Sequence, residues 1–215
     1  MMHSYKNIFI ESAYECGALQ FGEFTLNSGR TSPFFFNTGM FSSGKAINAI
    51  ANAYVDTIIK NDLQFDMLFG PAYKGIPLIT AISQVLYQRK NLSVPFSFNR
   101  KEKKHHGETG LLVGATIENQ VLVVDDVISS GISIAESIKT IQNNKGEVAS
   151  VIIALDRKEK KDNALEDEET MLILKKIPVV SIIDFFDILE FTRIKPELSS
   201  HQEPLLTYHE KYGIN

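Results

Sequence analysis

The sequence feature that most constrains this chain is the stretch VLVVDDVISSGIS, residues 121–133. Its four leading apolar residues are typical of a short strand that is buried on both faces of a parallel sheet. Two carboxylates follow at the predicted carboxyl end of that strand, which is where open α/β sheets bind ligands. Gly131 allows the backbone to approach a ligand closely, and Ser133 with Glu136 predicts a capping box at the start of a helix. The stretch therefore predicts an α/β fold with a ligand site where this strand ends.

A sugar that carries a phosphate would suit such a site. Backbone N–H groups and the dipole of a helix N-terminus hold phosphate groups, and Asp125 and Asp126 can accept hydrogen bonds from sugar hydroxyls. Acid pairs at strand ends also hold Mg²⁺ in receiver domains. A receiver needs a later strand-end aspartate, however, and too few residues follow Asp126 for the rest of that fold. A loop with no bound ligand is the remaining alternative.

The composition limits the class of protein. The chain has 215 residues, of which 44% are hydrophobic and 22% charged, as is ordinary for a globular domain with a full core. A net charge of −4 argues against binding to nucleic acid or to a membrane surface, and no apolar run reaches the roughly 20 residues that span a bilayer. The polar N-terminus lacks a signal-peptide pattern, and Cys16 is the only cysteine. We expect a cytoplasmic protein without a disulfide or a cysteine-based metal site.

Helical and strand-like segments alternate along the chain, which predicts a central, mostly parallel sheet flanked by helices. We expect helices at residues 4–19, 43–60, 77–89, 134–143, 165–175 and 184–195, and a partly helical tail from residue 196. We expect strands at residues 65–69, 94–98, 121–124, 148–155 and 179–183, a hairpin within residues 21–37, and a polar loop at residues 100–114. These segments fit a single domain, residues 1–215, with an N-terminal hood of about residues 1–40 on a core of about residues 41–195.

The loop at residues 100–114 is strongly basic near its start. From Arg100 to His106 it has four fixed positive charges, one negative charge and two histidines. A solvated surface loop is the ordinary interpretation of such a run. Because this loop precedes the acid-pair strand, it can also be a flexible lid that brings positive charge to a polyanionic substrate. Two adjacent histidines with no further His or Cys nearby do not indicate a metal site.

Two other strand ends carry basic side chains. The turn GPAYKG, residues 70–75, can present Lys74 and peptide groups to a second phosphate, although an ordinary strand-to-helix turn has the same pattern. Arg157 lies just past the predicted strand 148–155, on the side of the sheet that binds ligands. An arginine there can bind a planar carboxylate through two hydrogen bonds. Taken alone, it can equally be a surface arginine.

Taken together, these segments resemble a known enzyme family. The run VLVVDDVISSG is similar to the phosphoribosyl-diphosphate motif of type I phosphoribosyltransferases. The blocks FTLNSGRTSPFFFN, LFGPAYKGIP, FNRKEKKHHGE and ALDRKE resemble orotate phosphoribosyltransferases of the bacterial form, in the same order and spacing over roughly residues 8–190. The resemblance implies the type I phosphoribosyltransferase fold. It also implies transfer of the 5-phosphoribosyl group from 5-phosphoribosyl 1-diphosphate to orotate, which gives orotidine 5′-phosphate and diphosphate in pyrimidine synthesis.

The resemblance also assigns residues to the substrates. It implies that 5-phosphoribosyl 1-diphosphate contacts Tyr73, Lys74, Arg100, Lys101, Lys104, His106, Asp125, Asp126, Val127, Ile128, Ser129, Ser130, Gly131, Ile132 and Ser133. It implies that orotate contacts Phe35, Phe36, Ser129 and Arg157, with Arg157 at the orotate carboxylate. The implied catalytic residues are Lys104, His106, Asp125 and Asp126. Within these sets, the acid pair faces the ribose hydroxyls and residues 129–133 hold the 5′-phosphate.

The same resemblance implies a cofactor and an assembly. Mg²⁺ is expected, bound mainly by the diphosphate of the substrate and not directly by protein side chains. A homodimer is expected in which Lys104 and His106 of one subunit serve the site of the other. No nucleic-acid or membrane partner is expected.

Two residues depart from the family pattern. Asn27 stands where the family usually has lysine, which removes a cationic contact to the diphosphate, and Ile132 stands where threonine is common, which removes a hydroxyl from the phosphate loop. We expect weaker binding of 5-phosphoribosyl 1-diphosphate, with activity retained. Lys103 and His105 are additional positive or titratable groups that can compensate.

Two alternatives remain at the level of the sequence. A phosphoribosyltransferase for another base is disfavoured by Phe35, Phe36 and Arg157, since an arginine suits an acidic base better than a purine. A non-catalytic regulator that senses 5-phosphoribosyl 1-diphosphate should carry a basic face or a DNA-binding domain. Neither is evident, and the basic lid favours catalysis.

Overall fold

The computed structural model describes residues 4–102, 111–128, 131–160 and 175–214. Its helices are α1 (Ser4–Glu15), η1 (Thr38–Met40), α2 (Gly44–Lys60), α3 (Gly75–Lys90), α4 (Ile132–Asn143), α6 (Phe185–Ile194), η2 (Pro196–His201) and α7 (Gln202–Tyr212). Its strands are β1 (Leu19–Thr25), β2 (Thr31–Phe36), β3 (Met67–Gly70), β4 (Phe96–Asn99), β5 (Leu112–Gly114), β6 (Gln120–Val127), β7 (Glu147–Asp156) and β8 (Val179–Asp184). The expected helix at residues 165–175 falls almost entirely outside the described residues.

A six-stranded sheet forms the centre of the molecule, in the order β5-β4-β3-β6-β7-β8. Its neighbouring strands are parallel except for β5, which pairs antiparallel with β4. The predicted α/β class with a mostly parallel sheet is confirmed. The prediction of a loop as far as residue 114 is wrong at its end, because residues 112–114 pair with β4 and extend the sheet at its edge.

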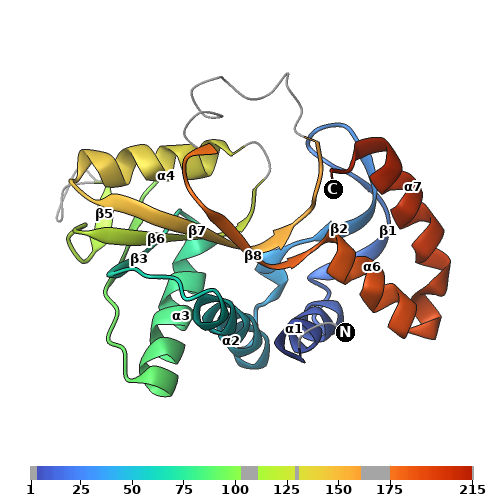
Figure 1. Ribbon diagram of the computed structural model, residues 1–215, viewed down its shortest axis with the longest axis horizontal. Helices are drawn as coiled ribbons and strands as arrows, with labels where there is room; N and C mark the ends of the chain where they lie inside the picture. The colour runs from blue at the N-terminus through green and yellow to red at the C-terminus, as the bar shows by residue number, and fades with distance from the viewer. Residues whose placement is uncertain (1–3, 103–110, 129–130, 161–174, 215) are drawn as a thin grey trace.

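The central strands are apolar on both faces because helices cover both faces. Figure 1 shows α4 on one side of the sheet and α2 and α3 on the other. Alternate strand residues divide between the two layers. The residues Met67, Phe69, Val121, Val123, Val151 and Ile153 pack with α4, whereas Leu68, Leu122, Val124, Ile152 and Ala154 belong to the larger core with α2 and α3. This two-sided burial explains the unbroken apolar run before the acid pair.

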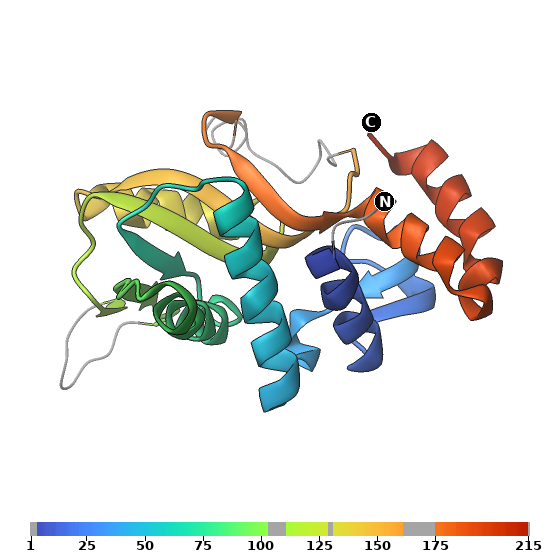
Figure 2. The same ribbon diagram turned by 60° about the horizontal axis from the view of Figure 1, so that its bottom comes forward.

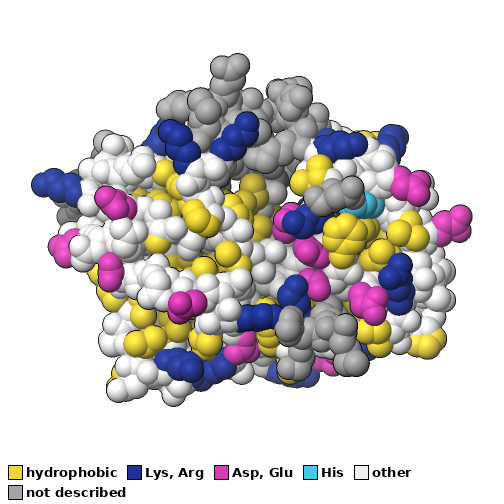
Figure 3. All heavy atoms as spheres, viewed as in Figure 1, with side chains coloured by type: hydrophobic (Ala, Val, Ile, Leu, Met, Phe, Trp, Pro, Cys, Tyr) yellow, Lys and Arg dark blue, Asp and Glu magenta, His cyan; other side chains and the backbone are white. Residues whose placement is uncertain are grey.

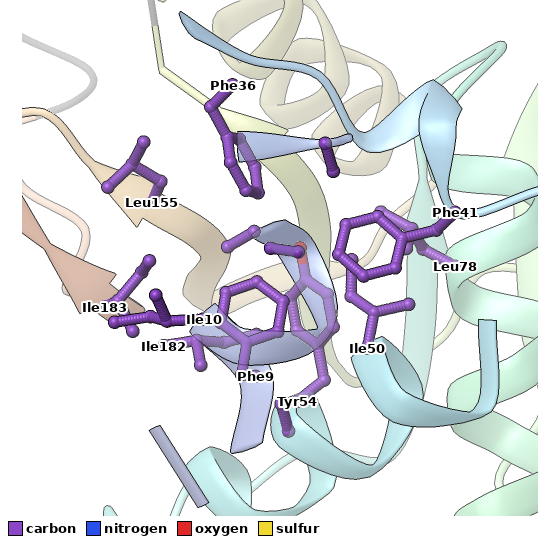
Figure 4. Packing of buried hydrophobic residues seen from close by; sticks show 14 of the residues in the cluster. Phe9, Ile10, Phe36, Phe41, Ile50, Tyr54, Leu78, Leu155, Ile182 and Ile183 are labelled. Carbon is purple, nitrogen blue, oxygen red and sulfur yellow. The ribbon is translucent and has the colours of Figure 1, made fainter. Parts of the chain in front are cut away.

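The hairpin of β1 and β2 forms a second, separate sheet, as the aromatic segment at residues 21–37 predicts. It lies between α1 and the C-terminal helices α6 and α7 (Figures 1 and 2). The same apolar core joins this part to the main sheet. Phe9 of α1 stacks on Phe41 at 5.9 Å and meets the edge of Phe36 at 6.2 Å, next to Tyr54 of α2 (Figure 4).

Ion pairs link the two ends of the chain. Lys6 of α1 donates to Asp187 of α6 at 2.5 Å, and Lys195 pairs with Glu11. The C-terminal residues therefore belong to the hood as much as residues 1–40 do, which the local sequence pattern did not indicate. Within the described ranges, no helix has the length and apolar content needed to cross a bilayer.

One helix start differs from its prediction. The capping box at Ser133 and Glu136 is wrong, because α4 begins at Ile132 and its N-cap is Gly131, with a φ of 76° and no side-chain cap. Ser133 lies inside the first turn and its hydroxyl donates to Asp125 at 3.5 Å. A glycine is suited to this position because L residues rarely adopt the left-handed conformation.

Candidate active site

The acid pair lies among the last three residues of β6, and not after the strand as the prediction of a strand at residues 121–124 implied. Side chains alternate along a strand, so the two neighbouring carboxylates point to opposite layers of the fold. Asp125 continues the series of Val121 and Val123 toward α4, whereas Asp126 continues the series of Leu122 and Val124 toward α2 and α3. Each carboxylate therefore has its own set of partners.

Asp126 is bound by groups from two other parts of the chain. Its Oδ2 accepts from Lys74 Nζ at 2.7 Å and from Thr38 Oγ1 at 2.9 Å, and its Oδ1 accepts from the backbone N–H of Val127 at 2.9 Å. The side chain is only 10% exposed. Asp126 is thus a buried carboxyl group that is held by three hydrogen bonds, one of them from an ammonium group.

Asp125 has weaker partners and is equally buried, with 8% exposure. Its Oδ1 accepts from the backbone N–H of Asp126 at 2.9 Å, and Oδ2 faces the Ser133 hydroxyl at 3.5 Å. Burial, followed by the charge of Asp126, raises the pKa of Asp125 to about 7. Near neutral pH, Asp125 can therefore be either protonated or ionised.

A buried tyrosine fixes the backbone between the two acids. The Tyr54 hydroxyl on α2 donates to the main-chain carbonyl of Asp125 at 2.7 Å. Its side chain is fully buried in the core (Figure 4). Burial, with the charges of Asp126 and Asp125, raises the pKa of Tyr54 well above its ordinary value, so it remains a hydrogen-bond donor.

The N-terminus of α4 faces the same end of the sheet. Residues 129–130 lie outside the described residues, but Gly131, Ile132 and Ser133 form the start of the helix. Because no side chain caps it, the N–H groups of its first turn can bind an anion, together with the positive end of the helix dipole. Ile132 is 47% exposed, so a threonine there would also have room. The expected phosphate site is thus beside the acid pair.

The turn after β3 and the residues after β4 form a second part of the site. They surround a pocket of about 360 Å³ that is lined by Ala72, Tyr73, Ile76, Phe98, Asn99, Arg100, Lys101 and Glu102. Lys101 Nζ lies 5.0 Å from the centre of the Tyr73 ring, and the Asn99 side chain accepts from the backbone N–H of Ala72 at 2.9 Å. The peptide bond between Ala72 and Tyr73 is cis. Three residues expected to contact the diphosphate thus line one pocket.

Arg157 follows β7, the strand that pairs with β6. Its Nε donates to Glu159 Oε1 at 2.7 Å, its Nη2 donates to Ser32 Oγ at 2.8 Å, and its guanidinium lies 4.0 Å from the centre of the Phe34 ring. The side chain is 15% exposed. Arg157 is therefore a held, half-buried group and not a free surface arginine.

The two phenylalanines expected at the base lie on opposite faces of β2. Phe36 is buried in the core against Phe9, while Phe35 is 37% exposed and stacks on Phe24 at 5.5 Å. Successive strand residues cannot present both rings to one ligand. The ring that contacts Arg157 belongs to Phe34. An orotate contact at Phe35 or Phe36 remains a prediction.

Several expected site residues lie outside the described residues: Lys104, His106, Ser129 and Ser130. Lys103 and His105 do so as well. Asn27 is described and lies exposed in the turn of the hairpin, where Leu26 and Arg30 pair at 2.9 Å. A lysine at that position would therefore meet no steric obstacle from burial.

Comparison with known proteins assigns the chain to a family. The model for the phosphoribosyl transferase domain matches residues 38–186. The orotate phosphoribosyltransferase of Marinobacter nauticus is 47% identical over 213 residues, which are 99% of this chain and 100% of that protein. The chain belongs to the orotate phosphoribosyltransferase family. The orotate phosphoribosyltransferase of Shigella flexneri is 42% identical over 216 residues, again 99% of this chain and 100% of that protein.

A crystal structure of an orotate phosphoribosyltransferase, from Francisella tularensis, has the same fold. It matches with a TM-score of 0.83 and 38% identity, and covers 96% of this chain and 100% of the other. The orotate phosphoribosyltransferase family and the type I fold, expected from five sequence blocks, are thus confirmed.

Sequence reasoning missed four residues of this orotate phosphoribosyltransferase site. They contact the predicted residues from distant parts of the chain: Ser32, Thr38, Tyr54 and Glu159. Only Glu159 had a local signal, because it lies two residues after Arg157 and carries the opposite charge. The other three are ordinary polar residues within apolar segments, and their sequence separations of 125, 88 and 71 residues become contacts only on folding.

Proposed function

We propose that the protein transfers the 5-phosphoribosyl group from 5-phosphoribosyl 1-diphosphate to orotate, giving orotidine 5′-phosphate and diphosphate in pyrimidine synthesis. The observation that carries this proposal is the pair of neighbouring strand ends in a member of the orotate phosphoribosyltransferase family. One strand presents Asp125 and Asp126 beside an uncapped helix N-terminus, and the adjacent strand presents a held Arg157. These groups match a phosphorylated sugar and an acidic base, respectively.

The acid pair would bind the ribose. Asp126, which is held by Lys74 and Thr38, accepts a hydrogen bond from a ribose hydroxyl, while the raised pKa of Asp125 lets it donate as well as accept. Residues 129–133 would hold the 5′-phosphate through backbone N–H groups that lead into the start of α4. The base would bind with its carboxylate on Arg157.

The reaction depends on stabilisation of charge in the transition state more than on covalent catalysis. When the bond between the ribose and the diphosphate breaks ahead of the new bond to orotate, positive charge grows on the ribose and negative charge on the diphosphate. Asp126 stabilises the first charge. Tyr73, Lys74, Arg100 and Lys101 border the place of the second, and fixed charges act most strongly where water is excluded. Lys74, the ammonium partner of Asp126, is a cation and can stabilise only the negative charge on the diphosphate.

We expect Mg²⁺ to bind to the diphosphate of the substrate and to enter the site with it. Among the described residues, no group of three His, Cys, Asp or Glu side chains is placed to hold a metal ion. Asp126 already accepts from Lys74 and Thr38, which leaves it little capacity for a cation. The ion would therefore arrive on the diphosphate oxygens, where it neutralises charge on the leaving group.

The proposal also includes a homodimer, in which the basic loop of each subunit, residues 100–114, reaches into the site of the other subunit. Arg100 and Lys101 begin the basic loop beside the pocket, and Lys104 with His106, beyond the described residues, would reach the diphosphate of the partner's site. Lys104 would be the principal contact to the developing negative charge, with His106 balancing protons at the diphosphate.

We expect Lys104→Ala to lower kcat by about 10²- to 10³-fold, as the loss of a preorganised charge at a transition state commonly does. The neighbouring variant Lys103→Ala is the matched control and should change kcat little. Steady-state kinetics separate the two outcomes, because an effect of Lys104→Ala on KM alone contradicts the role. Mixing Lys104→Ala with an acid-pair variant should restore activity if the loop crosses between subunits.

We expect Asn27→Lys to tighten binding of 5-phosphoribosyl 1-diphosphate by about tenfold, because a charge-assisted contact contributes about 1.5 kcal/mol or more. Titration of the enzyme with this substrate measures the effect. Asn27→Gln, which lengthens the side chain without adding charge, should leave the affinity unchanged. Equal affinities for all three proteins would count against a missing cation at this position.

The direct test of the function is the loss of orotate absorbance when protein, orotate, 5-phosphoribosyl 1-diphosphate and Mg²⁺ are mixed. Adenine, hypoxanthine and uracil replace orotate in parallel reactions and test a preference for another base. A protein that binds 5-phosphoribosyl 1-diphosphate but turns over none of the four bases would be a sensor. On the face drawn in Figure 3, described acidic and basic side chains are interspersed, without the continuous basic surface that a nucleic-acid-binding sensor would use.

A further inference from the structure

The arginine after β7 is held by two protein groups in the structure. Glu159 accepts from its Nε and Ser32 accepts from its Nη2, at 2.7 and 2.8 Å. The ring of Phe34 covers one face of the guanidinium at 4.0 Å from the ring centre. Neither of these two contacts uses Nη1 of the guanidinium. The side of the guanidinium that bears Nη1 is thus the part that can receive a ligand.

Glu159 is itself held in place. Arg30 Nη1 lies 3.6 Å from Glu159 Oε2 and donates to the carbonyl of Lys160 at 3.0 Å. The Glu159 side chain is only 16% exposed. Its two carboxylate oxygens therefore face two different arginines, Arg30 from the hood hairpin and Arg157 from the segment after β7. A carboxylate shared in this way has little freedom to turn.

The backbone that carries Glu159 is also fixed, by the end of α7 and the residues after it. Glu159 pairs with Gly213 in an antiparallel bridge. The N–H of Lys160 donates to the Tyr212 carbonyl at 2.7 Å, and the N–H of Ile214 donates to the Lys158 carbonyl at 2.8 Å. Figure 1 shows α7 beside the hairpin and the end of β7. The C-terminal residues thus determine where the Glu159 carboxylate lies.

We propose that Glu159 is a positioning residue for the base: it orients Arg157 so that the guanidinium offers Nη1 to the carboxylate of orotate. The inference rests on the proposed function, in which Arg157 binds that carboxylate. An arginine side chain has many rotamers, and a group that is oriented before the ligand arrives loses less freedom on binding. Glu159 also balances one of the two arginine charges, which leaves a single net positive charge for a ligand with one carboxylate.

The first test compares Glu159→Ala with Glu159→Gln. Glu159→Ala should raise the KM for orotate by about tenfold to a hundredfold, as small misplacements of binding groups do, and leave the KM for 5-phosphoribosyl 1-diphosphate within about twofold. Glu159→Gln retains an oxygen acceptor for Arg157 Nε and should recover most of the loss. Lys158→Gln removes a charge from the same segment by breaking the Lys158–Asp156 pair at 3.1 Å, and should behave like the wild type.

Product binding separates positioning from general destabilisation. Glu159→Ala should weaken binding of orotidine 5′-phosphate but not of uridine 5′-phosphate, which differs only by lacking the carboxylate. Equal losses for both nucleotides, or no loss for either, overturn the proposal. If the wild type itself turns over no orotate, the proposed function has failed. If the wild type is active and the orotate KM of Glu159→Ala is unchanged, only the role of Glu159 is wrong.

Discussion

Replacing both Asp125 and Asp126 by asparagine is expected to reduce kcat/KM by about 10²- to 10⁴-fold, because each hydrogen bond to a charged group contributes about 1.5–3 kcal/mol. Asparagine preserves the shape of each side chain, so the packing of the end of β6 between the two helical layers is retained while the negative charge next to the ribose is lost. Steady-state kinetics with orotate and 5-phosphoribosyl 1-diphosphate measure the effect.

The matched control is Asp62→Asn, which removes an exposed carboxylate just after α2. Its kcat/KM should equal that of the wild type. Full turnover by the double variant would remove the acid pair from the mechanism and with it the assignment of the ribose site. A loss confined to Asp126→Asn would instead assign the charge effect to the carboxylate that pairs with Lys74.

Asp125→Asn alone is expected to stabilise the folded protein at pH 8 and not at pH 4. The folded pKa of Asp125 is about 7, above the unfolded value of about 3.9. Below pH 4 both states are protonated, so burying this group carries no charge penalty. As the pH rises from 4 through 7, only the unfolded state ionises freely, and the wild type loses stability relative to the variant.

The difference between the two pKa values corresponds to about 4 kcal/mol above pH 7, and the weaker hydrogen bonds of asparagine reduce the expected gain to about 2 kcal/mol. Urea unfolding at pH 4, 6 and 8 measures it. A gain of the same size at all three pH values would contradict a raised pKa at Asp125. A more stable but impaired enzyme would show that this buried acid is retained for function at a cost in stability.

The sheet was predictable because its signals are local. The apolar run before Asp125 identified the central strand, and aromatic residues with an intervening turn identified the hairpin of β1 and β2. The start of α4 was predicted wrongly, although the capping box at Ser133 is also a local pattern. The Ser133 hydroxyl donates to Asp125, which lies eight residues earlier in the chain, and does not cap the helix. A sequence pattern of four residues contains no information about a hydrogen-bond partner, such as Asp125, that folding brings close from another element.

The site was predictable in its charged residues and not in the groups that orient them. Asp125, Lys74 and Arg157 stand at strand ends, and strand ends can be located from periodicity. Thr38 and Ser32 are a threonine and a serine in apolar surroundings, and nothing in the neighbouring residues shows that they contact Asp126 or Arg157. Their importance depends on the packing of the hairpin against the main sheet, which only the three-dimensional structure provides.

Because side chains alternate between the two faces of the sheet along β6, the number of residues in that strand affects the chemistry of the site. The buried residues Val121 to Val124 can be replaced by other apolar residues of similar size, but a residue cannot be added or removed without consequence. A single inserted residue would turn Asp125 toward Lys74 and Thr38 and turn Asp126 toward Ser133. The ammonium group of Lys74 would then pair with Asp125, and Asp126 would take the buried position beside Ser133. The number of residues in one strand thus decides which carboxylate the ammonium group binds.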